Sequence, residues 1–213
     1  MSTQGMSARD ALERLREGNR RFASDQRSVD VLASHARRAD LLAGQRPFAI
    51  ILGCSDSRVP AEIVFGQGLG DLFVIRVAGN VVAPSQVGSV EFAAAKFGTP
   101  LVVVLGHSRC GAIEATIQEL QQPAGTRSRN LRSIVNRVRP SVESLLATEL
   151  RHDPDALMRE AVKANVRASV DHLRHGSEVL EDLVATSGLR IVGAEYSLET
   201  GLVEFHDDAL EAD

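Results

Sequence analysis

Two short runs of apolar residues constrain the fold of this chain more than any other feature of its sequence. The runs occupy residues 48–53 and 101–105, and each reaches a glycine, Gly53 in the first case and Gly106 in the second. Runs of this length, rich in Val and Ile and without alternating polar residues, are typical of central strands buried on both faces of a parallel sheet. We therefore expect both runs to be inner strands of one sheet, each ended by its glycine.

Side chains that bind metals or transfer protons follow both runs. The sequence CSDSR begins at Cys54, directly after the first run, and HSRCG begins at His107, directly after the glycine of the second. Since the carboxyl ends of parallel strands meet at one edge of a sheet, where α/β proteins place their sites, these groups should converge there. The residues expected at this edge are Cys54, Asp56, Arg58, His107 and Cys110.

The rest of the chain alternates between strand and helix patterns, which indicates βαβ units. Helices are expected at residues 7–22, 35–43, 61–65, 85–97, 110–121, 131–147, 154–174 and 177–186. Further strands are expected at 72–77, 189–196 and 202–206, the last two forming a pair around Gly201. The predicted fold class is α/β, with a central, mostly parallel β-sheet, an antiparallel C-terminal edge strand, flanking helices and an N-terminal helical arm.

Length and patterning favour a single domain that covers residues 1–213. We divide it into an N-terminal helical arm (1–44), a metal-binding α/β core (45–120), a helical segment (121–188) and closing strands with a tail (189–213). In the arm, Ser7 and Asp10 predict a capping box. The apolar stripe of the helix that follows must pack on its own chain or on a partner subunit.

Charge and composition argue against several classes of function. The net charge of −4 and the pI near 5.9 give no basic surface for nucleic acid. No apolar run is long enough to cross a bilayer, and the N-terminus lacks the apolar core of a secretory signal, so we expect a cytoplasmic protein without a membrane partner. The two cysteines could form a disulfide, but in a reducing compartment paired cysteines more often bind metal or carry out chemistry.

The two cysteines and His107 form a pattern that suits zinc. Zinc binds thiolate and imidazole ligands, usually four in number, and a catalytic site keeps one position for water or substrate. Asp56 could fill that position, or Arg58 could hold Asp56 away from the metal in a bidentate pair. In an extended segment, Cys54, Asp56 and Arg58 would all point to one side of the chain. The residues alone leave open whether the site is closed and structural or open and catalytic.

The paired sequences CSDSR and GHSRCG resemble the signature of the β-class carbonic anhydrases. The similarity to this family extends over most of the chain. It includes Gln45 and Pro47 before the first strand, Phe73 and Arg76, the sequence AGN at 78–80, the sequence EFA at 91–93 and Gly201 of the last hairpin. No residue match is assigned within 121–130.

This resemblance implies a zinc enzyme that hydrates carbon dioxide reversibly to bicarbonate and a proton. Cys54, His107 and Cys110 would hold Zn²⁺, and zinc-bound hydroxide would attack carbon dioxide. Asp56 would orient the hydroxide, or would become a fourth metal ligand in a closed site, and Arg58 would keep Asp56 off the metal. The substrate-binding positions implied are Gln45, from across a dimer, Phe73, Phe92 and Gly111.

The resemblance also bears on regulation and assembly. One subdivision of the family is gated by bicarbonate through a pocket of Trp, Arg and Tyr. Arg76 and Tyr196 match two of these positions, but Ile51 stands at the third, and the chain contains no Trp. We therefore expect the kind that bicarbonate does not gate, in the form of a homodimer or homotetramer.

Other interpretations stay open from the sequence. A few relatives hydrolyse carbonyl sulfide or carbon disulfide, but they tend to carry Met-Asp-Ala-Arg where this chain has Ser-Asp-Ser-Arg. A non-catalytic zinc protein with Asp56 as the fourth ligand is a further alternative, against which the presence of Arg58 argues. By residue type alone, Gln45 could be a solvated loop residue, and Phe73 and Phe92 could be core residues.

Overall fold

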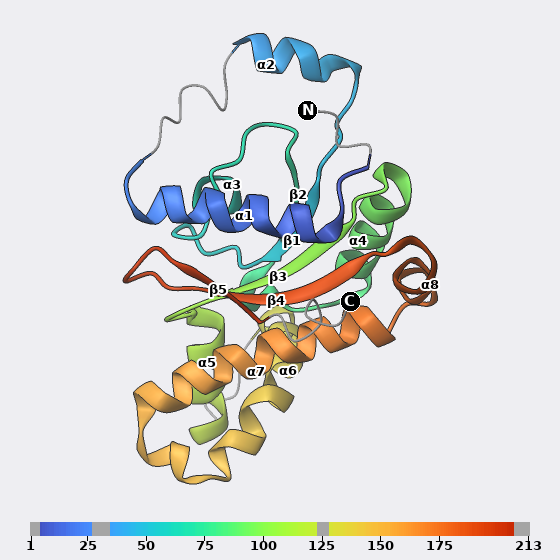
Figure 1. The fold of residues 1–213 in the computed structure, drawn as a ribbon. Helices are drawn as coiled ribbons and strands as arrows, with labels where there is room; N and C mark the ends of the chain where they lie inside the picture. The colour runs from blue at the N-terminus through green and yellow to red at the C-terminus, as the bar shows by residue number, and fades with distance from the viewer. Residues whose placement is uncertain (1–4, 27–34, 123–127, 207–213) are drawn as a thin grey trace.

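The sheet of this protein has five strands in the order β2-β1-β3-β4-β5, as seen in a computed structural model that describes residues 5–26, 35–122 and 128–206 (Figure 1). The strands are β1 (Ala49–Gly53), β2 (Leu72–Arg76), β3 (Leu101–His107), β4 (Arg190–Tyr196) and β5 (Val203–His206). The first four pair in parallel, and β5 pairs antiparallel to β4 at the edge. This arrangement confirms the predicted fold class.

Helices cover both faces of the sheet. The α-helices are α1 (Ala8–Ala23), α2 (His35–Asp40), α3 (Ala61–Val64), α4 (Pro84–Phe97), α5 (Gly111–Gln121), α6 (Arg129–Leu146), α7 (Pro154–His175) and α8 (Glu178–Ser187). Three short 3₁₀ turns are η1 (Leu41–Ala43), η2 (Ala78–Asn80) and η3 (Glu149–His152). Of these three, η1 lies within a predicted helix, whereas η2 and η3 were not predicted as helical elements. In the described part of the chain, none of the helices is both apolar enough and long enough to cross a membrane.

The prediction that Gly106 ends its strand was wrong. Strand β3 continues through Gly106 to His107, and Gly106 pairs with Glu195 of β4. A Cβ atom at position 106 would lie 2.5 Å from a methyl group of Val166 on α7. This glycine therefore allows α7 to approach the sheet closely and does not break the strand.

The N-terminal helix packs on its own chain. Ser7 caps α1 in a capping box with Asp10, as the sequence predicted. Its stripe of Ala11, Leu12 and Leu15 is fully buried in the core on one face of the sheet. In Figure 1, α1 lies across one face of the sheet, whereas α7 runs along the other.

Two further apolar clusters lie on the side of the sheet that carries α7. Residues of α4, α7 and α8 pack against buried side chains of β1 and β3, and Val166 of α7 is a member of this cluster. The other cluster joins α5, α6 and α7 and includes both cysteines, Cys54 and Cys110. One wall of the candidate site is thus part of the core.

The predicted subdivision of the chain at residues 44, 120 and 188 stays a prediction.

A buried asparagine connects α1 to the last hairpin and to α3. The Asn19 side chain, 3% exposed, donates to the carbonyl oxygens of Val64 and Gly201 and accepts from the N–H of Val203, at 2.8–3.2 Å. An isosteric leucine would leave all three backbone groups without these partners. Each unsatisfied buried group costs about 1–3 kcal/mol.

We therefore expect Asn19→Leu to lower the free energy of unfolding by about 3 kcal/mol, measured by urea denaturation. Asn136→Leu, on an exposed position of α6, is the matched control and should change this free energy by less than about 0.5 kcal/mol. Equal stability of the two variants would show that Asn19 does not hold these elements together.

Candidate metal centre

Three side chains of types that can bind a metal meet where β1 and β3 end. Cys54 directly follows β1, His107 is the last residue of β3, and Cys110 is the N-cap residue of α5. Their sulfur and nitrogen ligand atoms all lie within 4.8 Å of one another, and the three residues are at most 5% exposed. The parallel pairing of Gly53 with Leu105 produces this meeting, because it places the two strand ends side by side.

The imidazole of His107 is oriented for ligation. Its Nδ1 atom lies 2.9 Å from the carbonyl oxygen of Ser108, and so Nδ1 carries the proton and donates. The other nitrogen, Nε2, is buried and has no hydrogen-bond partner in the part of the chain that the structure describes. A buried nitrogen lone pair without a donor is unfavourable, and a cation between it and the two sulfurs would satisfy it.

The two thiols are electrostatically coupled. A hydrogen bond with Cys110 lowers the pKa of Cys54 to about 4 against the opposing effect of burial, and the N–H of Gly79 assists. The same hydrogen bond, together with burial, raises the pKa of Cys110. The pair thus gives up one proton readily and holds the second. A divalent cation would supply the positive charge that a second thiolate needs in this buried place.

Asp56 and Arg58 form a bidentate ion pair beside the three ligand groups. Arg58 donates from Nε to Oδ1 at 2.9 Å and from Nη2 to Oδ2 at 2.7 Å. These bonds keep the pKa of Asp56 well below its usual range. Oδ2 of Asp56 also lies 4.0 Å from Nε2 of His107, so the carboxylate faces the ligand group while it remains paired with Arg58.

The local backbone differs from the predicted extended segment. The N–H of Val59 donates to the carbonyl of Asp56 at 3.1 Å, and the N–H of Arg58 donates to Oδ1 of Asp56 at 2.9 Å. The chain therefore turns at Ser57 and Arg58. This turn brings the guanidinium back onto the carboxylate, whereas an extended chain would only have placed both on one side.

Several residues that position the site were not identified as such from the sequence. Arg76, at the end of β2, donates from Nε to the carbonyl of Cys54 at 3.1 Å and from Nη2 to that of Asp56 at 2.6 Å. On the other side, Arg109 pairs with Glu199 of the last hairpin and adopts a positive φ of 55°. The family resemblance named Arg76, as a matched position and as part of the gating pocket, but not as a residue that holds the loop of Cys54, and Glu199 carried no signal.

The predicted substrate-binding residues lie in different places. Gly111 begins α5 next to Cys110 and is exposed. Phe73 on β2 and Phe92 on α4 have ring centroids 6.2 Å apart, at the outer edge of the sheet. Gln45 is exposed and precedes β1, so it lies at the opposite end of that strand from Cys54. Within one chain, the fold does not bring Gln45 to the ligand group.

The donor set determines which metals fit. Two sulfurs and one imidazole nitrogen, with a fourth position next to a carboxylate, match the preference of zinc for soft thiolate and imidazole ligands. Both oxygens of Asp56 accept hydrogen bonds from Arg58, which holds the carboxylate back from ligation. A carboxylate oxygen can accept more than one hydrogen bond, so Asp56 is still available as an acceptor. The arrangement is suited to a metal that activates a small molecule at its fourth position.

Comparison with known proteins identifies relatives over most of the chain. The family model described as "Carbonic anhydrase" matches residues 49–203. "Carbonic anhydrase 2" of Mycobacterium tuberculosis is 40% identical over 205 residues, which cover 92% of each chain. A carbonic anhydrase of Mycolicibacterium smegmatis is also 40% identical, over 197 residues and 91% of each chain.

Solved structures show the same similarity. The β-carbonic anhydrase CafA of Aspergillus fumigatus superimposes with a TM-score of 0.71 at 27% identity, over 92% of this chain and 89% of that one. One of two tetrameric β-carbonic anhydrases of Sordaria macrospora gives a TM-score of 0.71 at 25% identity, over 80% of this chain and 85% of that one.

The geometry predicts metal binding that depends on His107. We expect His107→Asn to reduce bound zinc at least about tenfold, because the third ligand is lost, whereas the exposed His175→Asn should retain the wild-type content. Zinc per chain, measured by mass spectrometry of the metal after dialysis, tests this. A full zinc complement in His107→Asn would place the metal elsewhere.

Proposed function

The chain belongs to the β-class carbonic anhydrases, and we propose that it uses Zn²⁺ held by Cys54, His107 and Cys110 to hydrate carbon dioxide reversibly. The products of the forward reaction are bicarbonate and a proton. The observation that carries this proposal is the Asp56–Arg58 pair, which places a carboxylate next to the three donor atoms without making it a ligand.

Zinc bound at these donors would supply the nucleophile, because it lowers the pKa of a coordinated water molecule from about 15.7 towards 7. Asp56 is the hydrogen-bond acceptor that orients this nucleophile towards carbon dioxide. Arg58 fixes the carboxylate by two parallel hydrogen bonds and a third bond from Nη2 to the carbonyl of Arg109 at 3.2 Å. Arg58 thereby joins the two loops that carry the metal ligands.

The Asp56–Arg58 pair also favours a catalytic site over a closed one. For Asp56 to become a fourth zinc ligand, a carboxylate oxygen would have to leave a bidentate pair with Arg58. The unusually low pKa of Asp56 keeps the carboxylate charged, so the pair persists across the neutral range. A metal position that stays free for the nucleophile is what the hydration reaction requires.

We further propose that the enzyme is a homodimer or homotetramer in which Gln45 of one subunit reaches the site of another. Gln45 cannot serve its own site, because it lies at the far end of β1. The edge strand β2 and α4 carry an aromatic cluster of Phe73, Phe92 and Phe97, and Phe92 is 53% exposed. An exposed aromatic surface at a sheet edge is a typical subunit contact. The same surface would supply Phe73 and Phe92, the aromatic residues expected at substrate-binding positions.

The cytoplasm is the compartment that suits this chemistry. Cys54 and Cys110 must remain thiolates to bind zinc, and the cytosol keeps thiols reduced. We also propose that bicarbonate does not gate the enzyme, because Arg76 holds the carbonyl groups of Cys54 and Asp56 and Ile51 stands at the Trp position of the gated kind.

Removing the carboxylate of Asp56 tests the proposed mechanism. We expect zinc-loaded Asp56→Asn to retain one zinc per chain and to lose about 100-fold or more in kcat/KM for carbon dioxide hydration, measured by stopped flow. Asp171→Asn, an exposed carboxylate on α7, is the control and should keep wild-type activity.

The wild-type result separates the alternatives. Zinc-loaded wild-type protein that is inactive on carbon dioxide would contradict the proposal, and activity on carbonyl sulfide would then identify the hydrolase alternative. Inactivity on both substrates with one zinc bound would indicate the non-catalytic protein in which Asp56 is a ligand.

A charge in the aromatic cluster tests the assembly. We expect Phe92→Glu to shift the protein to a smaller species in size-exclusion chromatography with light scattering, because it buries a carboxylate in the subunit contact. Leu131→Glu, at an exposed position of α6 (59%), should leave the oligomer intact. An unchanged mass for Phe92→Glu would place the contact on another surface.

A further inference from the structure

The turn between β2 and α4 directs a backbone N–H group at a metal ligand. The N–H of Gly79, in η2, donates to Sγ of Cys54 at 3.3 Å. Gly79 and Asn80 both adopt positive φ, 69° and 43°. Among non-glycine residues Asn adopts the left-handed conformation most readily, and hydrogen bonds from neighbouring groups hold the turn in this shape.

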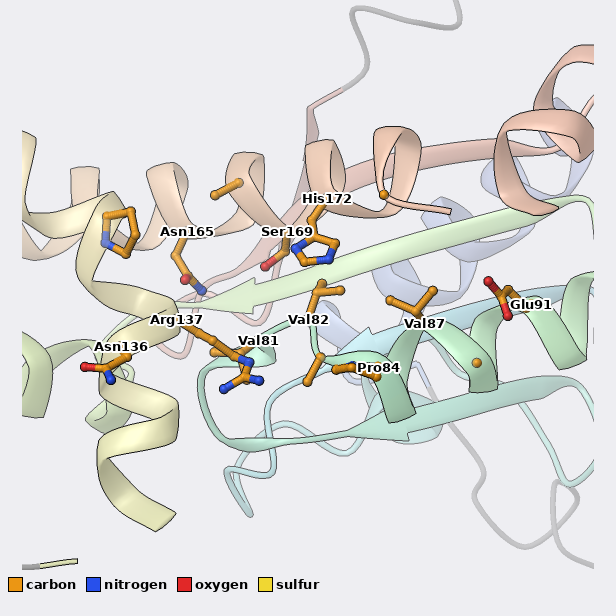
Figure 2. A pocket seen from close by; sticks show the side chains of 15 residues that line it. Val81, Val82, Pro84, Val87, Glu91, Asn136, Arg137, Asn165, Ser169 and His172 are labelled. Carbon is orange, nitrogen blue, oxygen red and sulfur yellow. The ribbon is translucent and has the colours of Figure 1, made fainter. Parts of the chain in front are cut away.

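Two side chains of α7 hold this turn. Nδ2 of Asn165 donates to the carbonyl oxygen of Gly79 at 2.8 Å, and Oγ of Ser169 donates to the carbonyl oxygen of Asn80 at 3.2 Å. Both residues are buried, at 2% and 5% exposure. They are four residues apart and so lie on the same face of the helix. Figure 2 shows both side chains directed from α7 towards the segment that carries Val81, just after the turn.

The surroundings of Asn165 and Ser169 limit how the turn at Gly79 and Asn80 can move. Asn165 and Ser169 line a cavity of about 670 Å³ between α4, α6 and α7. The opposite wall contains Asn136 of α6, which is exposed. A Cβ atom at Gly79 would lie 3.1 Å from Cβ of Ala112, so the turn already presses against α5 and has little freedom on that side. The hydrogen bonds from α7 secure the side that borders the cavity.

We propose that Asn165 and Ser169 are positioning residues of the metal centre, which act through the Gly79 N–H to fix and tune the Cys54 sulfur. A hydrogen bond to a thiolate stabilises its charge and sets the direction of its lone pairs towards a bound metal. Loss of the α7 contacts lets the turn relax, and the Gly79 N–H leaves the sulfur. This inference rests on the proposed metal site. Helix α7 carries none of the three metal-ligand residues, and its role is to hold the turn that positions one of them.

The test compares Asn165→Leu with Asn136→Leu. Both replace an asparagine of the same cavity by a residue of similar size, but only the first removes a donor to the turn. Zinc affinity is measured by competition with a chromophoric chelator. The thiolate-to-metal charge-transfer band is recorded on the protein loaded with Co²⁺. Asn165→Leu should bind zinc about tenfold or more weakly and shift the band to lower energy, whereas Asn136→Leu should match the wild type.

Serine variants provide a second, milder test if Asn165→Leu does not fold. Ser169→Ala should change the zinc affinity and the band energy in the same direction by a smaller amount. Ser169→Thr, which keeps the hydroxyl, should match the wild type in both. Wild-type affinity and an unshifted band in folded Asn165→Leu or Ser169→Ala would overturn the inference. So would a loss of affinity without a band shift, since general loosening of the fold would produce that result. If the wild-type protein binds neither zinc nor cobalt, the proposed metal site itself is wrong.

Discussion

The register of β3 against β1 is the constraint on which the rest of the site depends. Gly53 pairs with Leu105, so Cys54, the residue after β1, lies next to the end of β3, where His107 is the last residue. Side chains alternate between the two faces of a strand, and a slip of one residue would send His107 to the wrong face. Close packing opposes such a slip, because a Cβ atom at position 106 would lie 2.5 Å from Val166 of α7 and only glycine fits there. The packed strands therefore position Cys54 and His107 independently of the polar contacts of the loops.

Polar contacts from distant parts of the chain then fix the loops that follow the strands. Arg76 of β2 binds the backbone after β1, α7 binds the turn after β2, and the last hairpin binds the loop after β3. In each case a side chain or an N–H group forms a hydrogen bond with a polar group of the loop. That polar group, a carbonyl or a hydroxyl, has no partner within a helix or a strand. Unsatisfied backbone groups would otherwise be unfavourable at this depth. Each of the three loops is thus fixed by at least one contact from a distant part of the chain.

The sequence predicted what depends on local pattern and failed where long-range geometry decides. Apolar runs and turn residues were enough for the sheet, its closing hairpin and the cap at Ser7, and the paired motifs were enough to bring Cys54, His107 and Cys110 together. Gly106 was misinterpreted, because a glycine that ends a strand and one that admits a helix look alike in sequence. The contact of Asn165 with Gly79 could not be predicted, since nothing in either segment specifies the other.

The candidate metal centre is therefore a property of the whole fold and not of two motifs. In isolation, a buried imidazole nitrogen with no partner among the described residues and a buried thiolate charge are unfavourable in a core. A bound cation would convert the same groups into favourable interactions, and the free energy of binding would add to the stability of the folded chain. Because β2, α7 and the last hairpin each hold one loop, the unfolded chain offers no comparable site. Metal affinity and folding are then coupled through contacts that lie outside the ligands.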